Sequence, residues 1–128
     1  MNPKRILVID DDKGLTQMIK LNLEATGNYE VCTENYSPRA VETARRFRPD
    51  VILLDYIMPG MDGGDVTSRL HEDPFLRDVP IIMVTALVSN PEMSLDGTIQ
   101  CGGQLMLAKP VKMANLLKCI EKQLANSV

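Results

Sequence analysis

Side chains that could bind a cation or take part in chemistry stand at the ends of four apolar runs in this sequence. They are Asp10, Asp11, Asp55, Thr85 and Lys109. The three adjacent carboxylates at 10–12 repel one another, so this stretch favours a bound cation. Oxygen ligands alone suit Mg²⁺ or Mn²⁺ better than Zn²⁺, and Mg²⁺ characteristically combines one or two carboxylates with water and a phosphate. The residue types therefore indicate a magnesium site with Asp10 and Asp11 as ligands, directly or through water.

Some of these side chains, and the adjacent Asp12, also have an ordinary structural explanation. Asp12 fits a helix cap best, because an aspartate before the first turn accepts main-chain N–H bonds. Asp55 alone could be a common loop aspartate, and Thr85 could be a strand residue favoured for its β propensity. Four of the five expected strands nevertheless deliver a polar side chain to the same edge, which makes coincidence the weaker explanation.

The expected strands lie at residues 4–9, 29–34, 51–54, 80–84 and 104–108. The run Val51-Ile52-Leu53-Leu54 has no polar alternation, which is typical of a strand covered by helices on both faces. Helical patterns separate most of these strands, and Ser37-Pro38 predicts a capped helix start before the apolar stripe at 41–47. Strands that alternate with helices predict a parallel sheet with right-handed crossovers. Ligand sites in open α/β sheets form at the carboxyl edge of such strands.

Residues 87–103 have the least regular pattern in the chain. Ser89 and Pro91 could begin a helix, but Gly97 interrupts it, so we expect a short, irregular or mobile helix there. The bond between Lys109 and Pro110 is a candidate for a cis peptide, because only bonds before proline adopt that form at small cost.

Length and composition narrow the functional classes. A chain of 128 residues is expected to form one domain, and a net charge of −3 without a basic run beyond Arg45-Arg46 argues against direct nucleic-acid binding. No apolar stretch approaches the length of a membrane span, about 20 residues. Cys32, Cys101 and Cys119 are odd in number and form no Cys-x-x-Cys motif, which predicts reduced thiols in the cytoplasm. His71, the only histidine, is expected to be a solvated surface residue.

As a set, the motifs resemble the receiver domain of two-component response regulators, of the chemotaxis-regulator type. The matching stretches follow the family's order and approximate spacing, and they are Ile6-Leu7-Val8-Ile9-Asp10-Asp11-Asp12, Asp55-x-x-Met58-Pro59-Gly60-Met61-Asp62-Gly63, Thr85-Ala86 and Lys109-Pro110. The resemblance covers almost the whole chain and implies a single receiver domain over residues 1–128. It implies an α/β, flavodoxin-like (βα)5 three-layer sandwich with a five-stranded parallel sheet in the order 2-1-3-4-5.

The resemblance also assigns roles to the strand-end residues. It implies that Asp55 accepts a phosphoryl group from a histidine kinase or a histidine phosphotransfer protein. The implied ligands of Mg²⁺, or of Mn²⁺, are Asp10 (through water), Asp11, Asp55 and the main-chain carbonyl of Ile57. Lys109 would pair with one phosphoryl oxygen, and Thr85 would donate a hydrogen bond to another. Such a domain catalyses only its own phosphorylation and dephosphorylation, so we do not expect an enzyme with a separate substrate.

The output of such a domain is implied to be a change in protein binding. In the family, the threonine contact reshapes the surface of the fourth helix, fifth strand and fifth helix, which then binds a downstream protein or effector domain. The same face is implied as a homodimer interface. Met106 stands where family members usually carry Tyr or Phe, and Leu105 where an acidic residue is common. Because of these departures, we do not expect the aromatic side chain that reports phosphorylation in the family. The residues of the implied phosphorylation site are all present.

Two other functions fit part of the sequence. Ile9-Asp10-Asp11-Asp12 satisfies the strand-then-Asp-x-Asp pattern of haloacid-dehalogenase phosphatases, with Asp10 as nucleophile, but the chain is short and Asp55 would have no role. A pseudo-receiver that serves as a scaffold is the second alternative, and the complete acidic cluster argues against it.

The lifetime of a phosphoryl group on Asp55 is the subject of a further hypothesis. Ile57 and Leu87, which follow Asp55 and Thr85 by two residues, are both apolar. We expect them to hinder an attacking water and so to slow the loss of phosphate.

Overall fold

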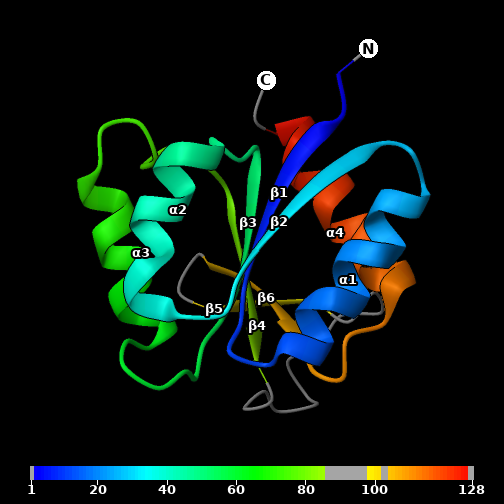
Figure 1. Cartoon of the computed structure of the whole chain (residues 1–128). Coiled ribbons are helices and arrows are strands. Elements are labelled where there is room, and N and C mark those ends of the chain that lie inside the picture. Colours follow the sequence, from blue (N-terminus) through cyan, green and yellow to red (C-terminus); the bar gives the residue numbers. More distant parts are fainter. Residues whose placement is uncertain (1, 86–97, 102–103, 127–128) are drawn as a thin grey trace.

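The computed structural model describes residues 2–85, 98–101 and 104–126 (Figure 1). The strands are β1 (Lys4–Ile9), β2 (Tyr29–Glu34), β3 (Val51–Asp55), β4 (Ile81–Thr85), β5 (Thr98–Cys101) and β6 (Gln104–Ala108). The helices are α1 (Lys13–Ala25), α2 (Ala40–Phe47), α3 (Gly63–Glu72) and α4 (Met113–Asn126), and a short 3-10 turn, Ser37–Arg39, precedes α2.

The strands form one sheet in the order β2-β1-β3-β4-β6-β5. The first five strands of this order pair in parallel, which confirms the predicted five-stranded parallel sheet, with β6 as its fifth strand. Strand β5 is an addition, because it pairs antiparallel with β6 and places Thr98 opposite Leu107. The expected irregular helix is therefore wrong for residues 98–101, and for 87–97 and 102–103 it lies outside the described residues. The free main-chain groups of β6 at the sheet edge explain why a strand forms there.

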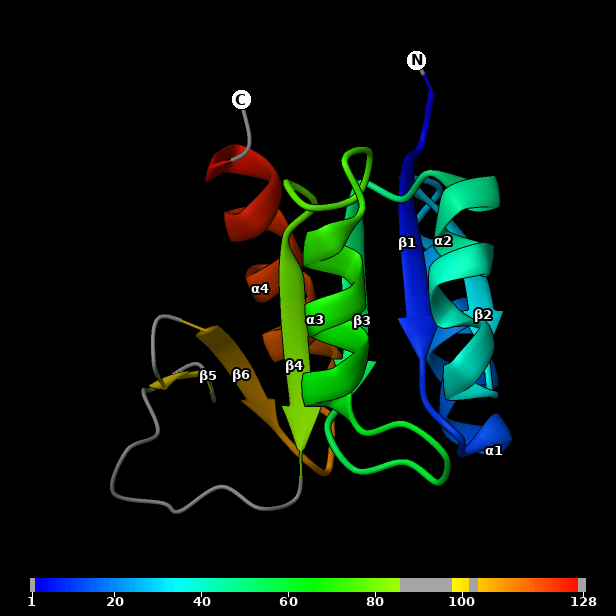
Figure 2. The same ribbon diagram turned by 90° about the vertical axis from the view of Figure 1, so that its left-hand side faces the viewer.

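Helices cover both faces of the sheet, with α2 and α3 on one side and α1 and α4 on the other (Figures 1 and 2). Alternate side chains of β1 therefore enter two different apolar clusters: Ile6 and Val8 pack with residues of α1 and α4, whereas Leu7 and Ile9 pack with residues of α2 and α3. The four apolar residues that begin β3 are at most 1% exposed, as expected for a strand covered on both faces. This arrangement confirms the predicted three-layer fold.

Aspartates cap α1 and α3, the helices that follow β1 and β3. The Asp12 side chain accepts a hydrogen bond from the main-chain N–H of Leu15 at 3.0 Å, at the start of α1. The Asp62 side chain accepts one from the N–H of Asp65 at 2.9 Å, at the start of α3. The predicted capping role of Asp12 is therefore confirmed.

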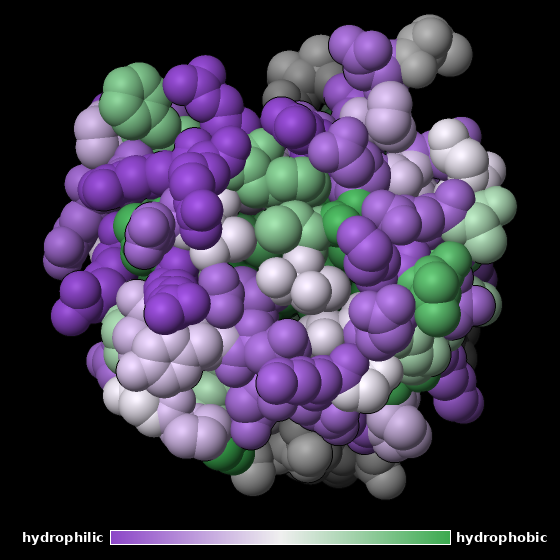
Figure 3. All heavy atoms as spheres, viewed as in Figure 1, coloured by the Kyte–Doolittle hydropathy of each residue, from purple (hydrophilic) through white to green (hydrophobic). Residues whose placement is uncertain are grey.

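The surface shown in Figure 3 is largely hydrophilic over the helices, and apolar atoms gather near its centre, between α1 and α2. Strand β2 forms that edge of the sheet. None of the helices in the described ranges is long and apolar enough to cross a membrane.

Candidate functional site

Three carboxylates come together at the carboxyl edge of the sheet. Asp10 follows β1 directly, Asp11 is the next residue, and Asp55 is the last residue of β3. Because β1 and β3 are parallel neighbours with Ile9 beside Leu54, Asp10 and Asp55 lie side by side. One carboxylate oxygen from each of the three aspartates lies within 4.8 Å of the others. Asp10 and Asp55 are only 3% and 6% exposed, whereas Asp11 is open to solvent.

Lys109 reaches the same carboxylates from the end of β6. Its Nζ donates to Asp10 Oδ2 at 2.9 Å and lies 3.3 Å from Asp55 Oδ1. Its main-chain N–H donates to the carbonyl of Thr85 at 2.9 Å. This bond ties the start of the loop between β6 and α4 to the end of β4. The bond between Lys109 and Pro110 is cis, as the sequence suggested. The structure thus assembles the predicted aspartate and lysine residues from three separate strand ends.

Burial and neighbouring charges determine the ionisation of this cluster. Burial raises the pKa of Asp55, and the negative charge of Asp10 raises it further, while Lys109 and a hydrogen bond from the main-chain N–H of Ile57 act in the opposite direction. Burial lowers the pKa of Lys109, but its hydrogen bond to Asp10 and the negative charges of both aspartates outweigh this, so its pKa lies above the ordinary value. Asp55 is therefore a carboxylate in a crowded anionic site, where an added cation would relieve repulsion.

Thr85 and Ile57 complete the predicted site. Thr85 ends β4, the neighbour of β3, and is 1% exposed. Because Asp55 pairs with Val84, Thr85 lies one residue beyond Asp55 at the same edge. The Ile57 side chain, in the loop after β3, is 57% exposed. The use of its carbonyl as a metal ligand stays a prediction, and Leu87 lies outside the described residues.

Sequence reasoning missed two residues that support the site, both in the connection between β2 and α2. Asn35 donates from Nδ2 to the carbonyl of Asp10 at 2.8 Å and to the Thr16 hydroxyl at 2.9 Å. Ser37 is 3% exposed, and its hydroxyl donates to the carbonyl of Pro59 and accepts from the N–H of Met61, both at 3.1 Å. Their position just after β2, at the same edge as the other strand ends, was the signal that could have identified them.

Two predictions concern side chains outside the acidic cluster. Met106 is half-buried and packs against the apolar cluster on the side of α2 and α3, beside Met83 of β4. A methionine of the core therefore occupies the position where the resemblance expects an aromatic ring. His71 is exposed on α3, as expected.

The acidic cluster has the donor set of a magnesium site. Three carboxylates supply oxygen ligands only, which suits Mg²⁺ or Mn²⁺. The exposure of Asp11 leaves the buried pair open to an ion that keeps several of its water molecules, as Mg²⁺ does. The ammonium of Lys109 contacts Asp10 and Asp55, and so offsets only part of the cluster's negative charge. The residues therefore fit a hydrated divalent cation.

Comparison with known proteins agrees with this geometry. A family model described as response regulator receiver domain matches residues 6–121. The chain is 39% identical over 107 residues to the response regulator PleD of Caulobacter vibrioides, a match that covers 84% of this chain and 23% of PleD. It is 33% identical over 121 residues to the DNA-binding response regulator MtrA of Mycobacterium tuberculosis, covering 94% of this chain and 50% of MtrA. The chain thus spans about a quarter to a half of the length of these curated relatives.

Solved structures show the same fold. A CheY-like response regulator receiver domain protein from Methanospirillum hungatei superposes with a TM-score of 0.80 and 28% identity, over 98% of this chain and 97% of that one. The chemotaxis response regulator CheY4 of Vibrio cholerae gives a TM-score of 0.79 and 28% identity, over 95% and 99% of the two chains.

Proposed function

This chain belongs to the response regulator receiver domain family, and we propose that it accepts a phosphoryl group on Asp55 from a histidine kinase or a histidine phosphotransfer protein. The observation that carries the proposal is the position of Asp55. It lies buried at the end of β3, beside Asp10 and 3.3 Å from the Lys109 ammonium. A carboxylate nucleophile beside a fixed cation is the arrangement that transfer of an anionic group requires.

Asp55 would act as the nucleophile of the transfer. One of its carboxylate oxygens forms a bond to phosphorus while the bond between phosphorus and the donor's imidazole nitrogen breaks. The electron pair leaves with the imidazole, which takes up a proton. Lys109 already contacts Asp10 and Asp55, so its ammonium can pair with an oxygen of a phosphoryl group on Asp55. The hydroxyl of Thr85, at the end of the neighbouring strand, would donate to another oxygen.

Four oxygen donors would hold Mg²⁺, or Mn²⁺ in its place, and they are Asp10 (through water), Asp11, Asp55 and the main-chain carbonyl of Ile57. When bound, the ion supplies positive charge that offsets the repulsion between the carboxylates and a phosphoryl group. The raised pKa of Asp55 supports this role, because part of it comes from the negative charge of Asp10.

The response to phosphorylation would be a change in the surface around β6 and α4, read by a downstream protein or an effector domain or used for homodimer formation. The matched regions of PleD and MtrA are parts of longer proteins, which supports the role of a module whose state another domain or protein reads. We place the protein in the cytoplasm, as one receiver domain over residues 1–128, and regard it as catalysing only its own phosphorylation and dephosphorylation.

Intact-mass measurement after incubation with acetyl phosphate and Mg²⁺ tests the proposal. The parent protein should gain the mass of one phosphoryl group, and Asp55→Asn should gain none. Asp10→Asn separates this function from a phosphatase that uses Asp10 as nucleophile, since it should slow the labelling without moving it to another residue. Label that survives Asp55→Asn would contradict the proposal, and a parent protein that never gains label would instead favour a scaffold.

A further inference from the structure

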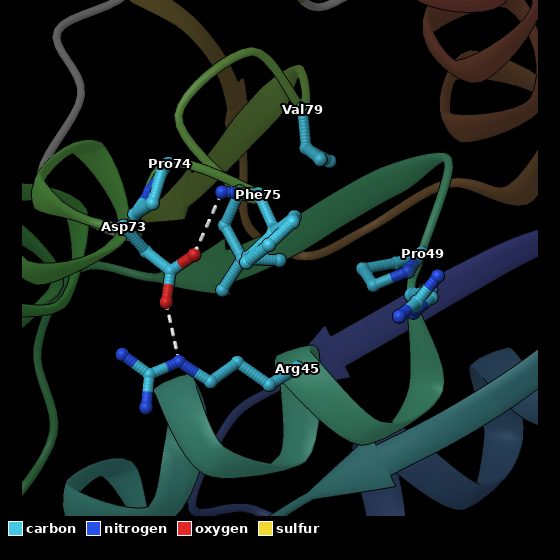
Figure 4. A pocket seen from close by; sticks show the side chains of 8 residues that line it. Arg45, Pro49, Asp73, Pro74, Phe75 and Val79 are labelled. Carbon is cyan, nitrogen blue, oxygen red and sulfur yellow. Dashed lines mark hydrogen bonds and ion pairs between the residues drawn. The ribbon is translucent and has the colours of Figure 1, made fainter.

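A cavity lies at the opposite end of β3 from Asp55. It has a volume of about 570 Å³ and lies between the end of α2 and the turn that follows α3 (Figure 4). Its lining includes Arg45, Arg48, Pro49, Phe75 and Val79, and none of the residues of the phosphorylation site. The volume falls within the range of small-molecule pockets, about 300–1,000 Å³.

Hydrogen bonds fix one wall of this cavity. Asp73 is 3% exposed, and its carboxylate accepts from Arg45 Nε and, at 2.8 Å, from the main-chain N–H of Phe75 (Figure 4). The hydrogen bonds from Arg45 and from the N–H of Phe75 lower the pKa of Asp73, so the carboxylate is ionised and holds both partners. The carbonyl of Asp73 also accepts from the N–H groups of Leu76 and Arg77, at 3.1 Å and 3.0 Å. The side chain and the main-chain carbonyl of Asp73 therefore both hold the turn that carries Phe75.

Phe75 is the most exposed large hydrophobic side chain in the described residues, at 84%. Leaving a phenyl ring in water is unfavourable, and exposed apolar surface beside a cavity is typical of a binding site. A ring of this kind offers a flat face on which another aromatic ring can stack.

The rim of the cavity is cationic. Arg45 binds Asp73 through Nε, and its side chain is 62% exposed, so the rest of its guanidinium keeps donor capacity at the surface. Arg48 follows α2 as its C-terminal cap, in the left-handed conformation with φ of 55°, which is uncommon for a residue other than glycine. Its N–H donates to the carbonyl of Ala44 at 2.8 Å, and the turn brings both Arg48 and Pro49 to the cavity. The lining of the cavity holds two arginines and one buried carboxylate, so its net charge is positive and favours an anion.

We propose that this cavity binds a small ligand that joins a flat ring to an anionic group, in the class of the nucleoside monophosphates. The ring would stack on Phe75 and contact Pro49 and Val79, and the phosphate would pair with Arg48 and with the outer nitrogens of Arg45. The inference is independent of phosphorylation at Asp55, because the two sites lie at opposite ends of the strand.

Titration followed by amide NMR tests the proposal on the whole chain. AMP or GMP should give saturable shifts at Arg48, Phe75 and Leu76. Adenosine, which lacks the phosphate, and ribose 5-phosphate, which lacks the base, should each bind about tenfold more weakly. Phe75→Ala and Arg48→Ala should each weaken nucleotide binding by about tenfold.

Matched controls separate this site from general surface effects. Arg46→Ala removes the exposed arginine that lies two positions before Arg48 on the chain and does not line the cavity, and Leu21→Ala removes another exposed apolar side chain, 59% exposed on α1. Both variants should keep the affinity of the parent protein. No saturable shift with either nucleotide, or shifts confined to Asp10 and Asp55, would overturn the proposal. The proposal would also be overturned if a short acidic peptide, and neither nucleotide, gave saturable shifts, because the cavity would then be a protein-docking site.

Discussion

Gly63, the first residue of α3, lies against the main chain of Asp55. A Cβ atom on Gly63 would come within 2.8 Å of the Asp55 carbonyl oxygen and of Tyr56 Cα. The N–H of Gly63 donates to the carbonyl of Tyr56 at 2.7 Å, which holds the end of β3 and the start of α3 together. The loop that follows Asp55 is therefore closed by a contact that leaves no room for a side chain.

Gly63→Ala should destabilise the fold by about 2 kcal/mol, because main-chain atoms rather than a flexible side chain would have to move. It should also slow phosphorylation of Asp55 by acetyl phosphate. Chemical denaturation and intact-mass kinetics measure the two effects. Gly14→Ala is the control: its Cβ would meet only Asp12 Oδ1 at 3.4 Å, an ordinary contact, so stability should be unchanged or rise by up to about 1 kcal/mol. Equal stabilities of the two variants would contradict the steric argument.

Asp55→Asn should stabilise the protein in the absence of Mg²⁺, by about 1 kcal/mol or roughly 4 °C at neutral pH. Burial and Asp10 raise the pKa of Asp55 in the folded state, so the ionised carboxylate disfavours folding at pH values above its unfolded pKa, about 4. The stability of the parent should therefore fall relative to Asp55→Asn as pH rises from 4 through the folded pKa. Thermal unfolding across this range in a chelating buffer measures the difference. If the difference in stability between the parent and Asp55→Asn were the same at every pH, the ionisation of Asp55 would not be its cause.

Asp11 and Asp12 are adjacent carboxylates for which we expect different roles. Mg²⁺ should raise the free energy of unfolding of the parent by about 2.7 kcal/mol at one hundred times its Kd. Asp11→Asn should lose most of this gain, because it removes a ligand. Asp12→Ala should cost about 1 kcal/mol through loss of the α1 cap but should keep the gain from Mg²⁺. Thermal unfolding with and without Mg²⁺ checks both variants. If Asp12→Ala lost the gain from Mg²⁺ and Asp11→Asn kept it, Asp12 rather than Asp11 would be the metal ligand.

The strand-end residues could be predicted because each follows an apolar run, and the parallel sheet places the ends of such runs at one edge. The roles of Asn35 and Ser37 could not be predicted in the same way, since their partners are main-chain groups 25 and 22 residues away. Ser37 was predicted to cap a helix, but Tyr36 precedes the 3-10 turn and no side chain caps it. The Ser37 hydroxyl instead bonds to the loop after β3.

Strand β5 escaped prediction for a related reason. The segment Thr98–Cys101 is short and has little pattern of its own, and its strand conformation depends on pairing with β6. In contrast, the apolar runs of β1, β3 and β4 predict buried strands without reference to any partner.

Asn35→Ala should weaken Mg²⁺ binding by about tenfold and destabilise the protein by about 2 kcal/mol. Asn35 holds the carbonyl of Asp10 and the Thr16 hydroxyl, so its loss frees the loop that carries Asp10 and Asp11. Calorimetric titration with Mg²⁺ measures the affinity. Asn22→Ala is the matched control, because Nδ2 of Asn22 donates to the carbonyl of Met18 on the exposed face of α1. A purely structural role for Asn35 would lower stability without changing the affinity for Mg²⁺.

Ile57→Asn should shorten the lifetime of a phosphoryl group on Asp55 by roughly tenfold. Ile57 is 57% exposed and lies two residues after Asp55, so an amide there can hydrogen-bond to a water molecule that the apolar side chain would exclude. Release of phosphate from the phosphorylated protein, followed by intact mass over time, measures the rate. Ile57→Val keeps the apolar character and should retain the parent lifetime. Because this side chain is exposed, neither variant should change the fold, and equal rates in Ile57→Asn and the parent would show that Ile57 does not control the access of water.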